Sequence, residues 1–72
     1  MKNEKFVVSL FNKNGVKVNT YAASTLEDAE RFAIAHVKAG IAKQTPINEA
    51  AVFGYSQGKF IMYSNFKNKE NL

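Results

Sequence analysis

Cysteine is absent from this sequence of 72 residues. Disulfide bonds and thiolate zinc sites are therefore excluded, and with them the small secreted proteins that depend on disulfides. A chain of this length forms one domain and buries only about 60% of the surface of its unfolded state. Its stability must come from efficient packing or from a partner chain, so we expect a homodimer or a subunit of a larger complex.

The residue types that carry out catalysis are also scarce. His36 is the only histidine, Asp28 the only aspartate and Arg31 the only arginine. Catalysis needs a nucleophile beside a base, paired carboxylates or a metal, and the phosphate-binding glycine patterns are missing as well. We therefore predict that the protein is not an enzyme, that it has no catalytic or metal-binding residues and that it needs no cofactor. His36 is interpreted as a packed or partly exposed histidine at a helix end.

Long apolar runs are missing too. No stretch approaches the ~18 residues that a transmembrane helix requires. The N-terminal residues 1–5 lead into a short apolar run, and no small-residue cleavage site follows. We expect a cytoplasmic protein that does not bind membranes.

The net charge of +4 comes from lysines that are scattered along the chain. Specific recognition of phosphates and bases relies on arginine, which has planar and bidentate donors. The charge therefore permits nucleic-acid binding without singling it out.

Residues 5–11 and 16–22 are rich in β-branched and aromatic side chains and are predicted to form a hairpin. A three-residue loop, 13–15, would place Gly15 in the left-handed position that such loops favour. The cross-strand pairs would then be Leu10–Val18, Val8–Thr20 and Phe6–Ala22, all on one apolar face. On the other face, Val7 would lie opposite Tyr21 and Phe11 opposite Lys17.

A helix is predicted over residues 25–39. Ser24 and Glu27 have the spacing of a capping box, and Gly40 is suited to end the helix. Helical periodicity places four residues on one apolar stripe, namely Leu26, Ala29, Ala33 and Val37. The alanines in this stripe allow the helix to lie close to a sheet.

The segment after the helix has two interpretations. Thr45 and Pro46 have the types preferred at a helix start, whereas the alternative, which we favour, is a strand that begins near Glu49. Residues 50–55 and 60–64 then form a second hairpin around a three-residue loop, 56–58. Its register stays open because both faces are apolar, with Val52, Phe60 and Met62 on one face and Phe53, Tyr55, Ile61 and Tyr63 on the other.

The predicted fold class is α+β, with the order ββαββ and a four-stranded antiparallel sheet that carries one helix on one face. The domain spans residues 1–66, and residues 67–72 are predicted to be a polar, disordered tail. One helix cannot cover both faces of a sheet, so aromatic residues remain on the uncovered face. The predicted partner-binding residues are Val7, Phe11, Lys17 and Tyr21, followed by Tyr55 and Tyr63.

The segment from Tyr21 to Glu30 resembles a strand-to-helix junction of small bacteriophage proteins. In these proteins a strand ends in alanine and a threonine–leucine–acidic–acidic–alanine helix start follows. The inhibitor of host RNA polymerase from T-odd phages has a similar junction, and small phage antitoxins have a similar size. The resemblance implies a class of small, non-enzymatic regulators that bind host proteins, and it carries over no functional residue.

Two functions follow as expectations. The first is a regulatory or inhibitory module that occupies the surface of a protein partner, such as a bacterial host protein. The alternative is a single-stranded nucleic-acid binder in which aromatic rings and lysines of the sheet form a stacking platform.

Overall fold

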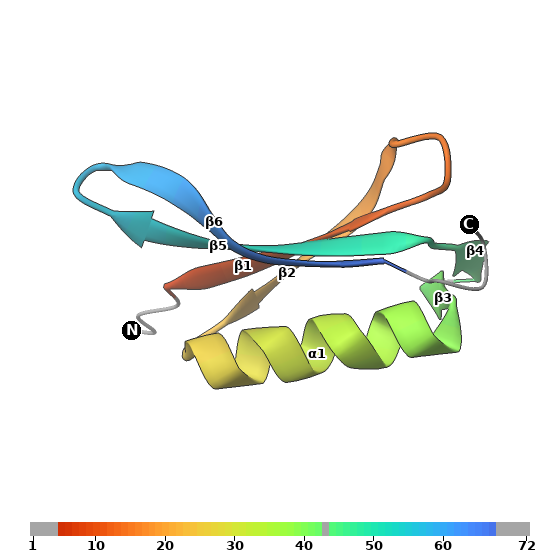
Figure 1. Ribbon diagram of the computed structural model, residues 1–72, viewed down its shortest axis with the longest axis horizontal. Coiled ribbons are helices and arrows are strands. Elements are labelled where there is room, and N and C mark those ends of the chain that lie inside the picture. The colour runs from red at the N-terminus through yellow and green to blue at the C-terminus, as the bar shows by residue number, and fades with distance from the viewer. Residues whose placement is uncertain (1–4, 43, 68–72) are drawn as a thin grey trace.

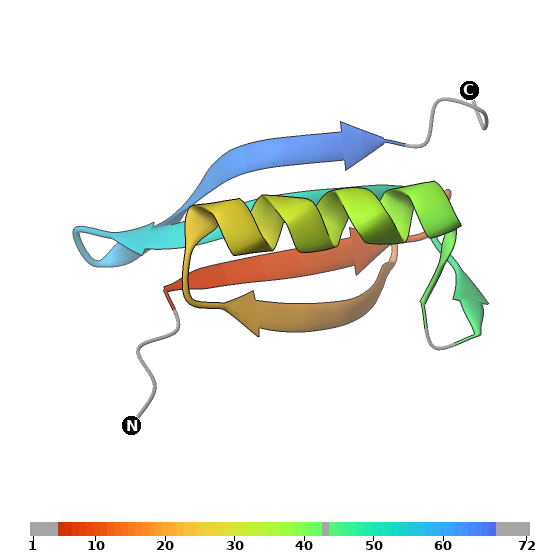
Figure 2. The same cartoon turned by 90° about the horizontal axis from the view of Figure 1, so that it is seen from below.

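The computed structural model of the protein describes residues 5–42 and 44–67. Four strands form one antiparallel sheet in the spatial order β2-β1-β5-β6, where β1 is Phe6–Phe11, β2 Lys17–Ala23, β5 Glu49–Ser56 and β6 Lys59–Lys67. Helix α1, Leu26–Ala39, lies along one face of this sheet (Figures 1 and 2). The predicted α+β class and the four-stranded antiparallel sheet with one helix are confirmed.

The loop between β1 and β2 has the predicted three residues. The Asn12 N–H donates to the Val16 carbonyl at 3.0 Å, and the Gly15 N–H donates to the Asn12 carbonyl at 3.0 Å. Gly15 has a φ of 80°, as a left-handed loop residue requires. The Asn12 side chain also accepts hydrogen bonds from the N–H groups of Asn14 and Val16.

Most of the predicted register of this hairpin is wrong, because a β-bulge interrupts β2. Phe11 pairs with Lys17 as predicted, but Leu10 pairs with Asn19, which leaves Val18 as the extra residue. The shift brings Tyr21 opposite Val8, on the face that the helix covers, and Val7 pairs with Ala22. The physical reason is burial, since the bulge lets both Val18 and Tyr21 pack against the core.

Helix α1 begins one residue later than predicted. Its N-cap is Thr25, whose hydroxyl oxygen accepts a hydrogen bond from the Asp28 N–H at 3.1 Å, and the predicted role of Ser24 is wrong. Gly40 ends the helix as predicted, with a φ of 73° and its N–H donating to the His36 carbonyl. Ala29, Ala33 and Val37 are buried, which confirms the apolar stripe.

A small two-stranded element follows the helix. Strand β3, Ile41–Ala42, pairs with β4, Thr45–Pro46, so Pro46 lies in a strand and does not begin a helix. The preferred alternative of a strand from Glu49 is confirmed by β5. The Asn48 N–H donates to the Phe11 carbonyl at 2.8 Å and ties this connection to the end of β1.

The second hairpin has a shorter loop than predicted. Ser56 pairs with Lys59, and only Gln57 and Gly58 lie between them, with φ values of 52° and 86°. Two consecutive positive φ angles define the two-residue type I′ turn, which matches the twist of the strands. A second bulge occurs at Tyr63, because Val52 pairs with Ser64 whereas Phe53 pairs with Met62.

The core lies between the sheet and α1 and contains few large side chains. Its largest fully buried residues are Leu10, Val8 and Val52, and half of the buried apolar residues are alanines. Strand β6 extends to Lys67, so the predicted domain boundary at residue 66 lies one residue too early. The remainder of the predicted tail, residues 68–72, lies outside the described residues. Within the described ranges, no helix combines the length and the apolarity needed to cross a membrane.

Candidate functional site

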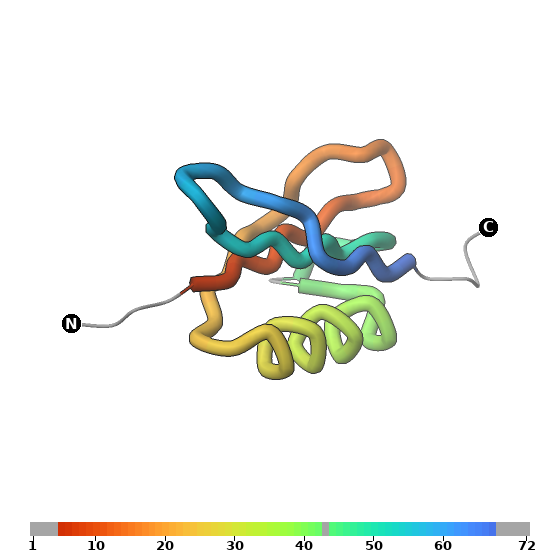
Figure 3. Tube along the Cα trace, turned by 60° about the vertical axis from the view of Figure 1, so that its left-hand side comes forward, coloured from red at the N-terminus to blue at the C-terminus, as the bar shows by residue number. Residues whose placement is uncertain are grey.

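The strongest candidate site is the sheet face opposite α1, which no described element covers. We call it the open face. Strand alternation and the pairing register place on it Lys5, Val7, Ser9, Phe11, Lys17, Thr20, Ala22, Glu49, Ala51, Phe53, Tyr55, Phe60, Met62, Asn65 and Lys67. The loops of both large hairpins rise on this side, away from the helix, so the sheet is concave here (Figures 1 and 3).

Two hollows lie on the open face, and Phe53 lines both of them. The first measures about 260 Å³ and is lined by Val7, Ser9, Lys17, Thr20, Phe53 and Phe60. The second measures about 210 Å³ and is lined by Phe11, Gly15, Glu49, Ala51, Phe53, Met62 and Asn65. Aromatic rings, methyl groups and one methionine dominate these surfaces, so they are suited to receive apolar side chains.

The open face carries more basic than acidic residues. Lys5, Lys17 and Lys67 lie on the open face, and Glu49 is the only acidic residue there within the described ranges. Its carboxylate accepts a hydrogen bond from the Asn65 side chain at 2.6 Å. The open face is therefore apolar with cationic margins.

The other described acidic residues belong to α1, on the far side of the sheet. Glu27 and Asp28 form ion pairs with Arg31 at 2.9 and 3.3 Å, and Glu30 accepts a hydrogen bond from the Ser64 hydroxyl. A binding partner of the open face thus meets lysines without compensating carboxylates from the helix.

Four of the six predicted site residues lie on the open face. Val7, Phe11 and Lys17 line its hollows, and Tyr55 lies at one end, with its ring in edge contact with Phe60 at 5.3 Å. The structure thus brings together residues from both hairpins that are far apart in the sequence.

The predicted position of Tyr21 is wrong. Its ring lies on the helix side of the sheet, with ring-centroid distances of 4.6 Å to Phe32 and 5.4 Å to His36. Its hydroxyl accepts a hydrogen bond from the Asn19 side chain at 3.0 Å. These contacts show that Tyr21 packs at the edge of the core.

Tyr63 also lies on the helix side of the sheet, not on the open face. Its ring packs over Gly54 and in edge contact with Phe6, at a centroid distance of 5.8 Å. The two-residue turn is the reason, because it pairs Ile61 with Gly54 on the helix side, and regular alternation then places Tyr63 on that side as well.

Sequence reasoning missed three residues of the site: Phe53, Phe60 and Met62. Phe60 and Met62 were assigned to the face opposite Phe53, but both lie on the same side as that residue. The alternation of Ala51, Phe53 and Tyr55 was visible in the sequence. The position of Phe53 relative to Phe11 depends on the pairing of β1 with β5, and no local feature of the sequence predicts this pairing.

His36 has the structural role that the sequence suggested. It is half-buried near the end of α1, its ring stacks on that of Phe32 at 4.2 Å, and its Nδ1 lies 3.0 Å from the Phe32 carbonyl oxygen. Within residues 5–42 and 44–67, no three histidine or acidic side chains lie close enough together to hold a metal ion.

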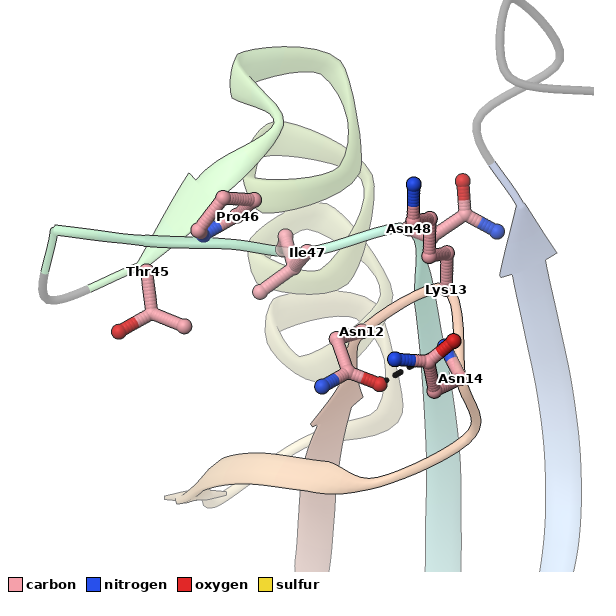
Figure 4. A pocket seen from close by; sticks show the side chains of 7 residues that line it. All are labelled: Asn12, Lys13, Asn14, Thr45, Pro46, Ile47 and Asn48. Carbon is pink, nitrogen blue, oxygen red and sulfur yellow. Dashed lines mark hydrogen bonds between the residues drawn. The ribbon is translucent and has the colours of Figure 1, made fainter.

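A larger hollow of about 410 Å³ lies between the β1–β2 loop and residues 45–48, which form β4 and its connection to β5 (Figure 4). Its lining combines Asn12, Lys13 and Asn14 with the segment from Thr45 to Asn48. The Asn12 side chain is already used to hold its own turn. The hollow thus lies where two connecting segments meet, and the open face remains the better candidate for a binding site.

Comparisons with known proteins add no relative: no protein-family model matches this chain, and searches of curated proteins and of solved structures found no significant match.

Proposed function

We propose that this protein is a small, non-enzymatic regulatory or inhibitory module that binds a protein partner through its open face. The observation that carries the proposal is the pair of apolar hollows beside Phe53, with lysines at their margins. Apolar surface of this kind gains free energy when it is covered, and aromatic and methionine side chains are typical of interface centres.

The chemistry of the open face also indicates what the partner carries. Two large apolar side chains would enter the hollows, and carboxylates beside them would meet Lys17 and Lys67. The resemblance of the segment from Tyr21 to Glu30 to phage regulators suggests the same class of activity, with a bacterial host protein as the target.

An affinity capture tests this proposal. Wild-type protein and the variant Lys17→Glu are immobilised and exposed to nuclease-treated bacterial lysate. The matched control is Lys38→Glu, which makes the same charge change at an exposed position on α1. We expect one protein to be retained by the wild type and by Lys38→Glu, and to be at least tenfold depleted with Lys17→Glu.

The proposal is contradicted if no protein is retained, or if all three baits retain the same protein equally. Phe53→Ser serves as a second variant, because it removes a ring that lines both hollows. Circular dichroism of each bait verifies that the fold persists.

Single-stranded nucleic acid is a second candidate ligand, and a separate observation favours it. The rings of Phe11, Phe53 and Phe60 share the open face with Lys5 and Lys17, which matches the composition of a stacking platform. Titration with a labelled oligothymidine distinguishes the two functions. Binding to phosphates falls steeply between about 50 and 200 mM salt, whereas an apolar protein contact changes little.

A further inference from the structure

The distribution of large apolar side chains is unusual for a protein that folds alone. The three largest fully buried side chains are Leu10, Val8 and Val52, and no aromatic ring is fully buried. In contrast, Tyr55, Phe60, Ile61, Met62 and Tyr63 are each between 40% and 59% exposed. Five of the eight exposed large apolar side chains of the described residues thus lie on one hairpin.

These five residues surround the turn of the β5–β6 hairpin, and we call residues 55–63 the hairpin tip. Lys59 is the only charged residue in it. Figure 2 shows that the tip projects past the start of α1, so the helix covers neither of its faces. Depletion of charge combined with exposed aromatic residues characterises the centre of an interface.

Strand β6 is moreover an edge strand of the sheet. The register places Phe60 and Met62 on the open face, whereas Ile61 pairs with Gly54 on the helix side. A protein bound to one face alone would leave half of these side chains in water. A strand added at the edge instead gives the β6 side chains cross-strand neighbours on both faces at once.

The exposed area matches the requirement of a dimer. An aromatic side chain buries about 150–250 Å², so the three rings together with Ile61 and Met62, all about half exposed, offer at most roughly 500 Å² per chain. Two chains together reach about 1,000 Å², the lower bound for a stable biological interface.

We infer that two copies of this chain associate through the hairpin tip, by antiparallel pairing of their β6 edges between Lys59 and Tyr63. A two-fold axis places Phe60 and Met62 of both copies on one face of the joint and Ile61 on the other. The bulge at Tyr63 ends the segment with regular pairing. A core rich in alanine stabilises a short chain only weakly, so the fold gains from a partner. A second copy is the partner that is present whenever the protein folds.

The inferred dimer shares Phe60 and Met62 with the hollows of the open face, whereas Ile61 lines neither hollow and lies on the helix side of the sheet. The β1–β2 loop and the hairpin tip lie at opposite ends of the long axis (Figure 1). Phe11 and Lys17, which flank the β1–β2 loop, therefore stay accessible in such a dimer.

Sedimentation equilibrium of the full chain tests the inference. We expect the wild-type mass to be twice the chain mass of 8.0 kDa, and the variant Ile61→Glu to sediment as a single chain. Ile34→Glu on α1 is the matched control, because Ile34 and Ile61 are 42% and 40% exposed. This control should remain a dimer.

A thermal melt extends the test to the case in which Ile61→Glu does not fold alone. The melting temperature of a folded dimer rises with protein concentration, whereas that of a monomer does not. A wild-type monomer with a concentration-independent melting temperature overturns the inference, and so does a dimer that both Ile61→Glu and Phe60→Glu leave intact. The capture experiment is read separately from these results, because Ile61 lines neither hollow of the open face.

Discussion

Gly54 occupies a position that leaves no room for a side chain. A Cβ atom there would lie 2.1 Å from Cε2 of Tyr63 and 2.9 Å from Cε1 of Phe6. The absence of a side chain on β5 thus allows the Tyr63 ring to lie across the sheet and contact Phe6. Glycine is otherwise unfavourable within a strand, so this contact explains its presence.

Gly54→Ala is expected to lower the free energy of unfolding by about 1–3 kcal/mol, as is typical of overpacking. Urea denaturation at fixed protein concentration measures the loss. In a Tyr63→Ala background the closest contact disappears, so the same substitution should cost less than half as much. An equal cost in both backgrounds would show that the Tyr63 ring does not lie over Gly54.

Tyr21 provides a second test at the scale of one residue. Because its ring packs against Phe32 and His36, Tyr21→Ala should lower the free energy of unfolding by about 2–3 kcal/mol. Tyr21→Phe keeps the ring and loses only the hydrogen bond from Asn19, at a cost of about 1 kcal/mol. If Tyr21→Ala leaves the urea midpoint unchanged, the tyrosine faces water and the bulge in β2 is absent.

At the scale of the element, two adjacent hydroxyl residues, Ser24 and Thr25, precede α1 and have different roles. Thr25 accepts the hydrogen bond from the Asp28 N–H, whereas the sequence pattern had favoured Ser24. Thr25→Ala should destabilise the protein by about 1 kcal/mol, the usual effect of losing an N-cap. Ser24→Ala should change the stability by less than about 0.5 kcal/mol in the same thermal or urea measurement. The reverse order would restore Ser24 as the cap.

The turn of the second hairpin carries a residue that is poorly suited to it. Gln57 has a φ of 52°, and left-handed backbone is unfavourable for most residues with a Cβ atom. Gln57→Asn creates the Asn-Gly pair that type I′ turns prefer and should stabilise the protein by roughly 0.5 kcal/mol. Ser56→Asn, one residue earlier, serves as the control, and a gain of similar size there would contradict the assignment of the turn.

At the scale of the whole molecule, the described residues form a four-stranded sheet, a small two-stranded element and one helix around a core of small side chains. Proteins have roughly 0.05–0.15 kcal/mol of stability per residue, so a chain of this length has only a few kcal/mol to lose. The fully buried Leu10 contributes a large part of that stability.

Leu10→Ala is therefore expected to cost about 3–5 kcal/mol and to unfold most of the protein at 25 °C. Circular dichroism and the urea midpoint measure this effect. Val16→Ala, in the exposed β1–β2 loop, provides the control with an expected change of less than about 0.5 kcal/mol. A folded Leu10→Ala variant with a cooperative transition near the wild-type midpoint would mean that the stability resides elsewhere.

The sequence by itself determined the features whose physics is local. The left-handed Gly15 and Gly40, the alanine stripe of α1 and the alternation of β1 each depend on interactions within a few residues, and all were predicted correctly. The same local signals identified Val7, Phe11 and Lys17 as residues of the uncovered face.

Only the tertiary structure decided the register and the strand order. The bulge at Val18 lets both Val18 and Tyr21 pack against the core, and the bulge at Tyr63 lets Phe66 pack on the same side of the sheet as Tyr63. The pairing of β1 with β5 joins residues that are distant in the sequence, such as Phe6 and Gly54, and it alone brings Phe53 opposite Val7. Such long-range choices depend on how the whole chain buries its apolar surface, so no short segment of the sequence encodes them.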